Sequence, residues 1–163
     1  MTLTDFTSYA DIRAALGVGE AEIEDTVISL PIYVNNLGME MDSISLSLVA
    51  DFTTATAAVT PTAAQSRFLR AMQLFASYAV ARQLTTSLPL FSPKEIHDGK
   101  ASMVRYAQNP YDATIKAVKQ AYETYKIAVI DSFGELHSAG ATVAVTRTYF
   151  ARVASSYDPV TGV

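Results

Sequence analysis

YDATIKAVKQAYETYKIAVIDSFGEL, residues 111–136, contains the most regular hydrophobic pattern in the chain. Large apolar side chains recur there at steps of three or four residues, which is the spacing of one face of an α-helix. They are Ile115, Val118, Tyr122, Tyr125, Val129, Phe133 and Leu136. Pro110 precedes the segment, so we predict one long amphipathic helix that begins after it. This segment makes a mainly helical fold the first expectation.

A second long helix is predicted in TPTAAQSRFLRAMQLFASYAVARQL, residues 60–84. Thr60 has the side chain of an N-cap, and Pro61 suits the first helical position because no backbone N–H is needed there. The two prolines of SLPLFSP, residues 87–93, are expected to end the helix. The apolar stripe of this helix consists of Phe68, Met72, Phe75 and Ala79, with Leu69 and Val80 nearby.

The N-terminal region is predicted to form shorter helices. Ser8 is a plausible N-cap with Asp11 three residues later, and Gly17 suits the left-handed position that ends a helix. A second helix is expected to begin near Glu20, where acidic residues favour the positive end of the helix dipole. Its apolar positions continue at helical spacing, and Pro31 should kink or break it.

The middle of the chain gives weaker signals. Residues 41–52, MDSISLSLVADF, alternate apolar residues with serines, so residues 44–49 form either a short strand or more helix. Residues 53–65 are small and polar, and we predict a loop.

The C-terminal segment differs from the rest. ATVAVTRTYFARVA, residues 141–154, is rich in β-branched and aromatic residues and predicts a strand, followed by a tail of turn-forming residues. The predicted fold is therefore mainly α: a bundle of about four to five helices over residues 1–140, and a β-strand arm with an extended tail over residues 141–163. A lone strand needs a partner, so we interpret this arm as an assembly element. A hairpin with residues 44–49 is the alternative.

SPKEIHDGKASMVRY, residues 92–106, has residue types found in active sites, but its start resembles a helix cap. Ser92 serves as the cap, Pro93 as the first helical residue and Glu95 as the capping carboxylate three positions on. The sequence therefore predicts a structural helix start here.

The candidate catalytic residues of this stretch are His97, Asp98 and Lys100. Adjacent residues on a helix do not face each other, which argues against a base at His97 oriented by Asp98. His137 is predicted at a helix end, where a cation favours the dipole. No nucleotide-binding, nucleophile-elbow or zinc-protease motif occurs. We expect no enzyme, no cofactor and no metal site.

Composition and charge limit the remaining classes. The chain has 163 residues, no cysteine and a net charge of -4. Residues 1–60 carry nine acids and one base, whereas residues 61–163 carry seven acids and eleven bases. The bases are spread singly, unlike a nucleic-acid-binding patch. No signal peptide or membrane-spanning stretch is recognisable, so we expect a soluble protein without membrane partners. The charge asymmetry indicates either ordinary solvated faces or contacts between copies of the chain.

Two stretches carry a resemblance to a known family. Residues 8–41, SYADIRAALGVGEAEIEDTVISLPIYVNNLGMEM, resemble the N-terminal pattern of head-tail connector proteins of tailed bacteriophages, also called adaptor or head-completion proteins. Residues 88–130, from LPLFSPKEIHDGKASMVRY onward, are similar to the second half of such neck proteins. The resemblance implies a helical bundle in a ring, commonly of twelve copies. It would lie in the virion neck between portal and tail proteins, with DNA passing through the centre, after synthesis in the host cytoplasm.

Two groups of residues are candidates for contacts in such an assembly. The acidic group is predicted to line the lumen or a subunit interface and consists of Glu20, Glu22, Glu24 and Asp25. The C-terminal group is predicted to contact the portal or a neighbouring copy and consists of Val143, Val145, Arg147, Tyr149, Phe150, Arg152 and Tyr157. Other neck or tail components, such as a tail terminator or a head accessory protein, and a small helical enzyme or binding module remain as alternatives.

Overall fold

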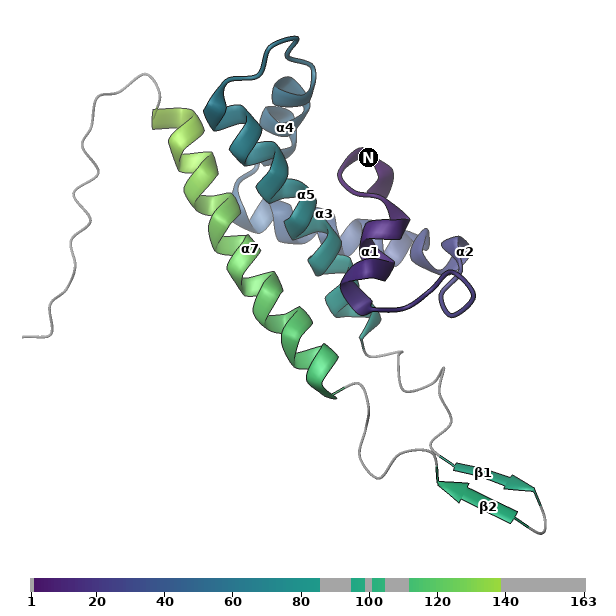
Figure 1. The fold of residues 1–163 in the computed structure, drawn as a ribbon. Coiled ribbons are helices and arrows are strands. Elements are labelled where there is room, and N and C mark those ends of the chain that lie inside the picture. The colour runs from purple at the N-terminus through teal and green to yellow at the C-terminus, as the bar shows by residue number, and fades with distance from the viewer. Residues whose placement is uncertain (1, 86–94, 99–100, 105–111, 139–163) are drawn as a thin grey trace, which may run out of the picture.

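The structure, a computed structural model, describes residues 2–85, 95–98, 101–104 and 112–138. Most of these residues are helical, which confirms the mainly α prediction (Figure 1). The elements are η1 Leu3–Asp5, α1 Tyr9–Leu16, α2 Asp25–Ile28, α3 Pro31–Ile44, α4 Leu48–Thr56, α5 Ala63–Leu84, β1 Glu95–Asp98, β2 Ala101–Val104 and α7 Asp112–Ser138.

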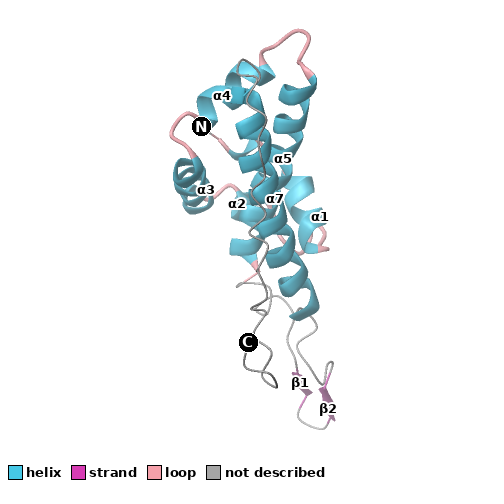
Figure 2. Cartoon of the chain, turned by 90° about the vertical axis from the view of Figure 1, so that its left-hand side faces the viewer, coloured by secondary structure: helices cyan, strands magenta, loops and turns pink. Residues whose placement is uncertain are grey.

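The two long helices α5 and α7 lie side by side along most of their lengths (Figures 1 and 2). The predicted stripe of α5 is fully buried, as Phe68, Met72 and Phe75 show. On α7, Val118 and Val129 are buried at the facing positions. The hydrophobic periodicity therefore identified both helices and their inner faces correctly.

The shorter helices pack around α5, which makes α5 the centre of the core. Ile12 of α1, Leu37 of α3 and Phe52 of α4 are all buried in the same cluster. A buried hydrogen bond of 2.6 Å joins the hydroxyls of Thr7 and Ser77, and it fixes the N-terminal segment to α5. Burial without a partner would be costly for either hydroxyl, so the two satisfy each other.

Helix boundaries in the N-terminal region agree with the sequence only in part. The Asp11 N–H donates to the Ser8 hydroxyl, and Gly17 has a left-handed φ of 70°, as expected for the two ends of α1. The predicted helix start near Glu20 is wrong, because α2 begins only at Asp25. Pro31 breaks the run as predicted, and it is the first residue of α3.

The predictions for residues 44–65 need correction. Of the two alternatives for residues 44–49, helix is the better one: α3 ends at Ile44, α4 begins at Leu48, and these residues form no strand. Leu48 and Phe52 are four residues apart and both buried, so a helical turn satisfies their burial better than a strand does. The predicted loop is shorter than expected, because α4 continues to Thr56. The cap of α5 is Thr62, which forms a capping box with Gln65, and not Thr60.

The helix predicted to start at Ser92 is also wrong. Glu95–Asp98 is strand β1, which pairs antiparallel with strand β2, Ala101–Val104. Glu95 is therefore not a helix-capping residue. Two residues, Gly99 and Lys100, separate the paired Asp98 and Ala101 in the sequence, and glycine at the first of two linking positions is a hairpin signal that the capping pattern concealed. Figures 1 and 2 show the hairpin beyond the ends of α5 and α7.

Candidate functional site

A polar cluster joins three helices at the end of α5. Arg82 of α5 donates from Nη2 to Oε1 of Glu40 on α3, at 2.5 Å. The Arg82 guanidinium also lies 4.1 Å from the ring centre of Tyr122 on α7. Beside it, Asn36 Nδ2 donates to Gln83 Oε1 at 3.0 Å. The cluster therefore connects α3, α5 and α7 through side chains that are far apart in sequence.

Burial determines the chemistry of this cluster. Tyr122 is only 4% exposed. Burial raises the pKa of Tyr122 to about 12, and the neighbouring Glu40 carboxylate adds to the effect. Glu40 Oε2 and Arg82 Nε are buried without a hydrogen-bond partner among the described residues. Glu40 and Arg82 are therefore each other's charged partner, and Tyr122 interacts with both, which fits a structural clamp that joins three helices.

One hydrogen bond and one ion pair attach α7 to its neighbours near its C-terminal end. His137 Nε2 lies 3.1 Å from Asp51 Oδ2 of α4, and Arg67 of α5 lies 3.1 Å from Glu135. The Phe133 ring is 4.5 Å from the His137 ring, measured between centroids. His137 does lie in the last turn of α7, as predicted, but its contact with Asp51 has no signal in the sequence.

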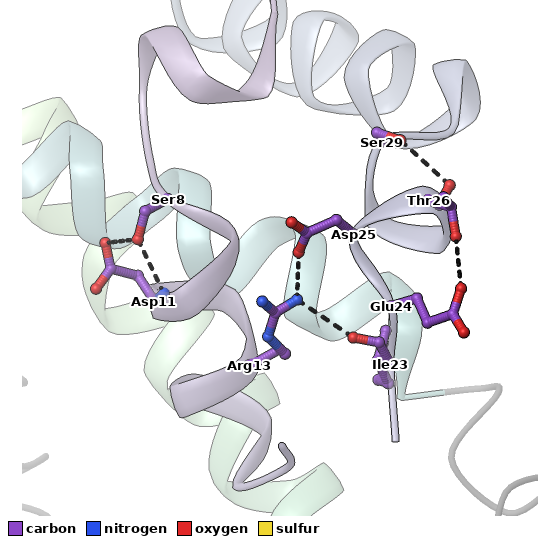
Figure 3. Close-up of polar contacts among 8 residues, drawn as sticks. All are labelled: Ser8, Asp11, Arg13, Ile23, Glu24, Asp25, Thr26 and Ser29. Carbon is purple, nitrogen blue, oxygen red and sulfur yellow. Dashed lines mark hydrogen bonds and ion pairs between the residues drawn. The ribbon is translucent and has the colours of Figure 1, made fainter. Parts of the chain in front are cut away.

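The acidic segment before and within α2 has mostly local contacts (Figure 3). Arg13 of α1 forms a 2.6 Å ion pair with Asp25 and donates to the backbone oxygen of Ile23. Glu24 Oε2 accepts a hydrogen bond from the Thr26 hydroxyl. Glu22 Oε2 accepts from the backbone N–H of Gly19, at 2.7 Å.

The four acidic candidates do not share one helical face. Glu20, Glu22 and Glu24 precede α2, and Asp25 is its first residue. All four are exposed. Their side chains are therefore available to solvent, although Asp25 is already neutralised by Arg13.

The other predicted contact residues fall partly outside the described chain. Val143, Val145, Arg147, Tyr149, Phe150, Arg152 and Tyr157 all lie outside the described residues, and so does Lys100. The C-terminal arm, residues 141–163, therefore stays a prediction. His97 and Asp98 belong to strand β1 rather than to a helix.

One exposed apolar surface was missed by the sequence analysis. Ile32, Met39 and Leu46 are 58%, 72% and 86% exposed. They recur every seven residues, so Ile32 and Met39 lie on one outer face of α3 and Leu46 follows just beyond its end. We call these three residues the α3 stripe. The sequence analysis followed the apolar positions of one helical face in this region, gave Ile32 and Met39 no role, and placed Leu46 in the alternating segment 41–52.

An apolar groove lies on another side of the body. It has a volume of about 550 Å³, and Phe6, Phe52 and Val49 are among its lining residues. Asp5 and Thr53 contribute polar atoms to its lining. This groove lies between the N-terminal segment and α4.

The described residues form neither a metal-binding cluster nor a membrane-spanning helix. Within residues 2–85 and the other described ranges, no group of three or more histidine and acidic side chains is arranged to hold a metal ion. No described helix is long and apolar enough to span a membrane. Comparison with known proteins found no match to the chain among family models, curated proteins or solved structures.

Proposed function

We propose that this chain is a structural virion protein, a head-tail connector that forms a ring between the portal and the tail of a bacteriophage. The proposal rests on the resemblance of residues 8–41 and 88–130 to such neck proteins. In this role the chain is no enzyme and needs no cofactor.

The observation that carries the proposal is the α3 stripe. Soluble monomers rarely keep a row of large apolar side chains in water, and such rows commonly mark contacts with other proteins. Ile32 and Met39 lie on α3, Leu46 follows its end, and the Glu40–Arg82 pair joins α3 to α5. A helical body with an exposed apolar face is what we expect of a subunit that assembles with other proteins.

In the proposed assembly the ring has a homo-oligomeric contact, a portal-facing side and a tail-facing side. The resemblance implies twelve copies and a central channel for the genome. Glu20, Glu22 and Glu24 are exposed and acidic, and at the channel wall they would repel DNA phosphates and limit binding during passage.

The test uses the purified chain and the portal protein encoded in the same genome. Native mass spectrometry and negative-stain images should show an annular oligomer, either of the chain alone or after addition of portal. Mass spectrometry of purified virions should detect the chain. A chain absent from virions, with no affinity for portal, would contradict the connector function.

A helical binding module is the second candidate, and the groove beside Phe6 and Phe52 favours it. Its apolar lining with a few polar atoms is typical of ligand sites. A monomeric chain that binds a small apolar ligand or a peptide in this groove, with no presence in virions, would support this candidate instead.

A further inference from the structure

The groove between the N-terminal segment and α4 combines apolar walls with an acidic edge. Phe6 and Phe52 are among its lining residues, and their ring centroids are 4.9 Å apart. Thr53 of α4 also lines it and is exposed to solvent. Asp5 is the one charged residue among the described residues of the lining, and it is exposed too. The volume of about 550 Å³ is that of a small ligand site, so the groove can accept a large apolar side chain with a cation beside it.

The helix that precedes the C-terminal segment ends beside α4. α7 ends at Ser138, and in its last turn His137 Nε2 lies 3.1 Å from Asp51 Oδ2 of α4. α4 and this end of α7 lie at the same end of the body (Figure 1). The C-terminal segment, residues 139–163, therefore begins next to the helix that forms one wall of the groove.

The groove and the end of α7 lie on different sides of α4. Val49, Thr53 and Thr56 line the groove at steps of four and three residues, so they share one face of the helix. Asp51 is two positions from both Val49 and Thr53, which places it on another side, toward α7. The C-terminal segment therefore has to cross a helix about 10 Å in diameter to reach the groove. Residues 139–143 alone can span about 16 Å when extended, so the residues that follow them can lie in the groove.

The segment and the surface around the groove have opposite charges. Residues 14–66, which include all of α4, contain seven acids and neither lysine nor arginine. Asp5 adds a negative charge at the groove itself. Residues 139–163 carry two arginines, Arg147 and Arg152, against a single acid. A basic segment therefore begins next to an acidic surface, which favours contact between them.

Two residues of the segment match the groove in type and spacing. Phe150 is its largest wholly apolar side chain, and Arg152 follows two positions later. In an extended chain such residues point to the same side, about 7 Å apart. Asp5 directly precedes Phe6 in the chain, so the acidic edge adjoins the apolar wall. One extended stretch can thus place a ring against Phe6 and Phe52 and a guanidinium beside Asp5.

We propose that the C-terminal segment folds back across α4 and occupies this groove in the same copy of the chain, with Phe150 as its aromatic anchor and Arg152 beside Asp5. Attachment to the same chain favours this occupant, because a tethered segment has a high effective concentration at any site that its linker can reach. The inference goes beyond the proposed function, since it concerns the free chain and holds whether or not the chain enters virions. A small ligand or a peptide would have to displace the segment.

A single tryptophan tests the anchor, because the chain contains none. Phe150→Trp should emit at shorter wavelength and be quenched less by acrylamide than Tyr149→Trp, whose ring points away from the groove in an extended chain. Adding Thr53→Lys to the Phe150→Trp chain places a cation in the groove and should move the emission back to longer wavelength.

Thr54→Lys is the matched control for the blocked groove. Thr54 is the exposed neighbour of Thr53 on α4, each hydroxyl donates to a backbone oxygen four residues earlier, and Thr54 is not a lining residue. Circular dichroism checks that both lysine variants keep their helices. Equal quenching of the two tryptophan variants, or a Phe150→Trp emission that Thr53→Lys leaves unchanged, overturns the proposal.

Charge reversal in the Phe150→Trp chain tests the contact with Asp5. Arg152→Glu should raise the acrylamide quenching, because it places two carboxylates side by side. Arg147→Glu makes the same change of charge on the other side of an extended segment and should have little effect. Equal quenching of the two charge variants overturns the placement of Arg152 beside Asp5.

Disulfide trapping distinguishes the same copy from a neighbouring copy, because the chain contains no cysteine. A chain with both Thr53→Cys and Thr148→Cys should oxidise within the monomer, well above the level of a chain with Ile127→Cys and Thr148→Cys. Ile127 is 58% exposed and nearer to Thr148 in sequence, so random encounter favours the control pair. Denaturing gels and intact mass give the yields. A disulfide-linked dimer in place of the internal bond, or an internal bond no more abundant than the control, overturns the proposal.

The outcomes also separate this contact from the connector function. A chain that forms rings with portal while Phe150→Trp stays solvent-exposed in the free chain contradicts the groove contact and leaves the connector function standing. A buried Phe150→Trp and an internal disulfide in a chain that is absent from virions support the groove contact and contradict the connector function.

Discussion

Glu40 and Arg82 are 42 residues apart in the chain, yet their side chains form a short ion pair that joins α3 to α5. The guanidinium is also in contact distance of the Tyr122 ring, so α7 belongs to the same arrangement. A pair of this kind contributes little when intact but is costly to break, because the remaining charge stays partly buried.

Arg82→Met should therefore destabilise the fold by about 1–3 kcal/mol, since it leaves the Glu40 carboxylate without its partner. The double variant Glu40→Leu with Arg82→Met should recover part of this loss, because no buried charge remains. Urea unfolding of the wild type, both single variants and the double variant measures the coupling between the two residues. A double variant that loses the full sum of the two single effects would show that Glu40 and Arg82 do not interact and would contradict the clamp.

Tyr122 should make stability depend on pH in the alkaline range. Its pKa is raised to about 12 in the folded chain from the ordinary 10.0, so the folded state favours the neutral phenol. This contribution is complete below about pH 10 and is lost as the pH rises toward 12, because the unfolded chain releases the proton first.

Tyr122→Phe removes this titration, so its stability should decline less steeply than that of the wild type between these pH values. Chemical denaturation at several alkaline pH values gives the comparison. Tyr125→Phe is a matched control on the same helix, because Tyr125 is only partly buried. If the free energy of unfolding declined equally with pH in the wild type and in Tyr122→Phe, the raised pKa of Tyr122 would be contradicted.

The aromatic residues of the α5–α7 contact should differ in their importance. Phe75 is fully buried and its ring centre is 5.7 Å from that of Tyr122, so Phe75→Ala should cost about 3–5 kcal/mol. Phe133 is only partly buried, between Phe68 and His137, and Phe133→Ala should cost less. Thermal unfolding of the two variants shows which substitution costs more stability. An equal cost at both positions would mean that a partner or another segment covers Phe133.

The start of α5 gives a matched pair of substitutions two residues apart. Thr62 accepts a hydrogen bond from the Gln65 N–H, so Thr62→Ala should cost about 0.5–2 kcal/mol. Thr60 precedes the cap and makes no helix contact of this kind, so Thr60→Ala should leave stability nearly unchanged. The denaturant midpoints of the two variants show which threonine caps α5. A larger loss of stability for Thr60→Ala than for Thr62→Ala would show that Thr60 is the cap, as the sequence predicted.

These comparisons show which parts of the fold the sequence predicted. The stripes of α5 and α7 were predicted correctly, because burial of large residues at helical spacing is a strong constraint over many turns. Boundaries failed where two local signals competed, as at Thr60 and Thr62. The Ser92 and Glu95 pattern likewise predicted a helix in place of strand β1, because the capping residues were given more weight than Gly99, which favours a two-residue hairpin link between Asp98 and Ala101.

The candidate site was less predictable, for a physical reason. Glu40 and Arg82, or Asp51 and His137, meet only because separate helices pack on α5, and their 42- and 86-residue separations leave no periodic trace. The outer residues of α3 were also hidden, since exposed apolar residues look the same in sequence as buried ones. One sequence therefore predicts faces within a helix better than contacts between helices.

The last prediction concerns the limits of the folded body. The described helices already bury one hydrophobic cluster among themselves, in which Phe68, Phe75 and Val129 are fully buried. Deletion of residues 141–163 should therefore leave the helical body folded, with a melting temperature close to that of the full chain. If the segment is the proposed assembly arm, the truncated chain should at the same time fail to join virions. Truncated chains that still enter infectious particles would contradict the arm, and a truncated chain that is unfolded would show that these residues complete the core.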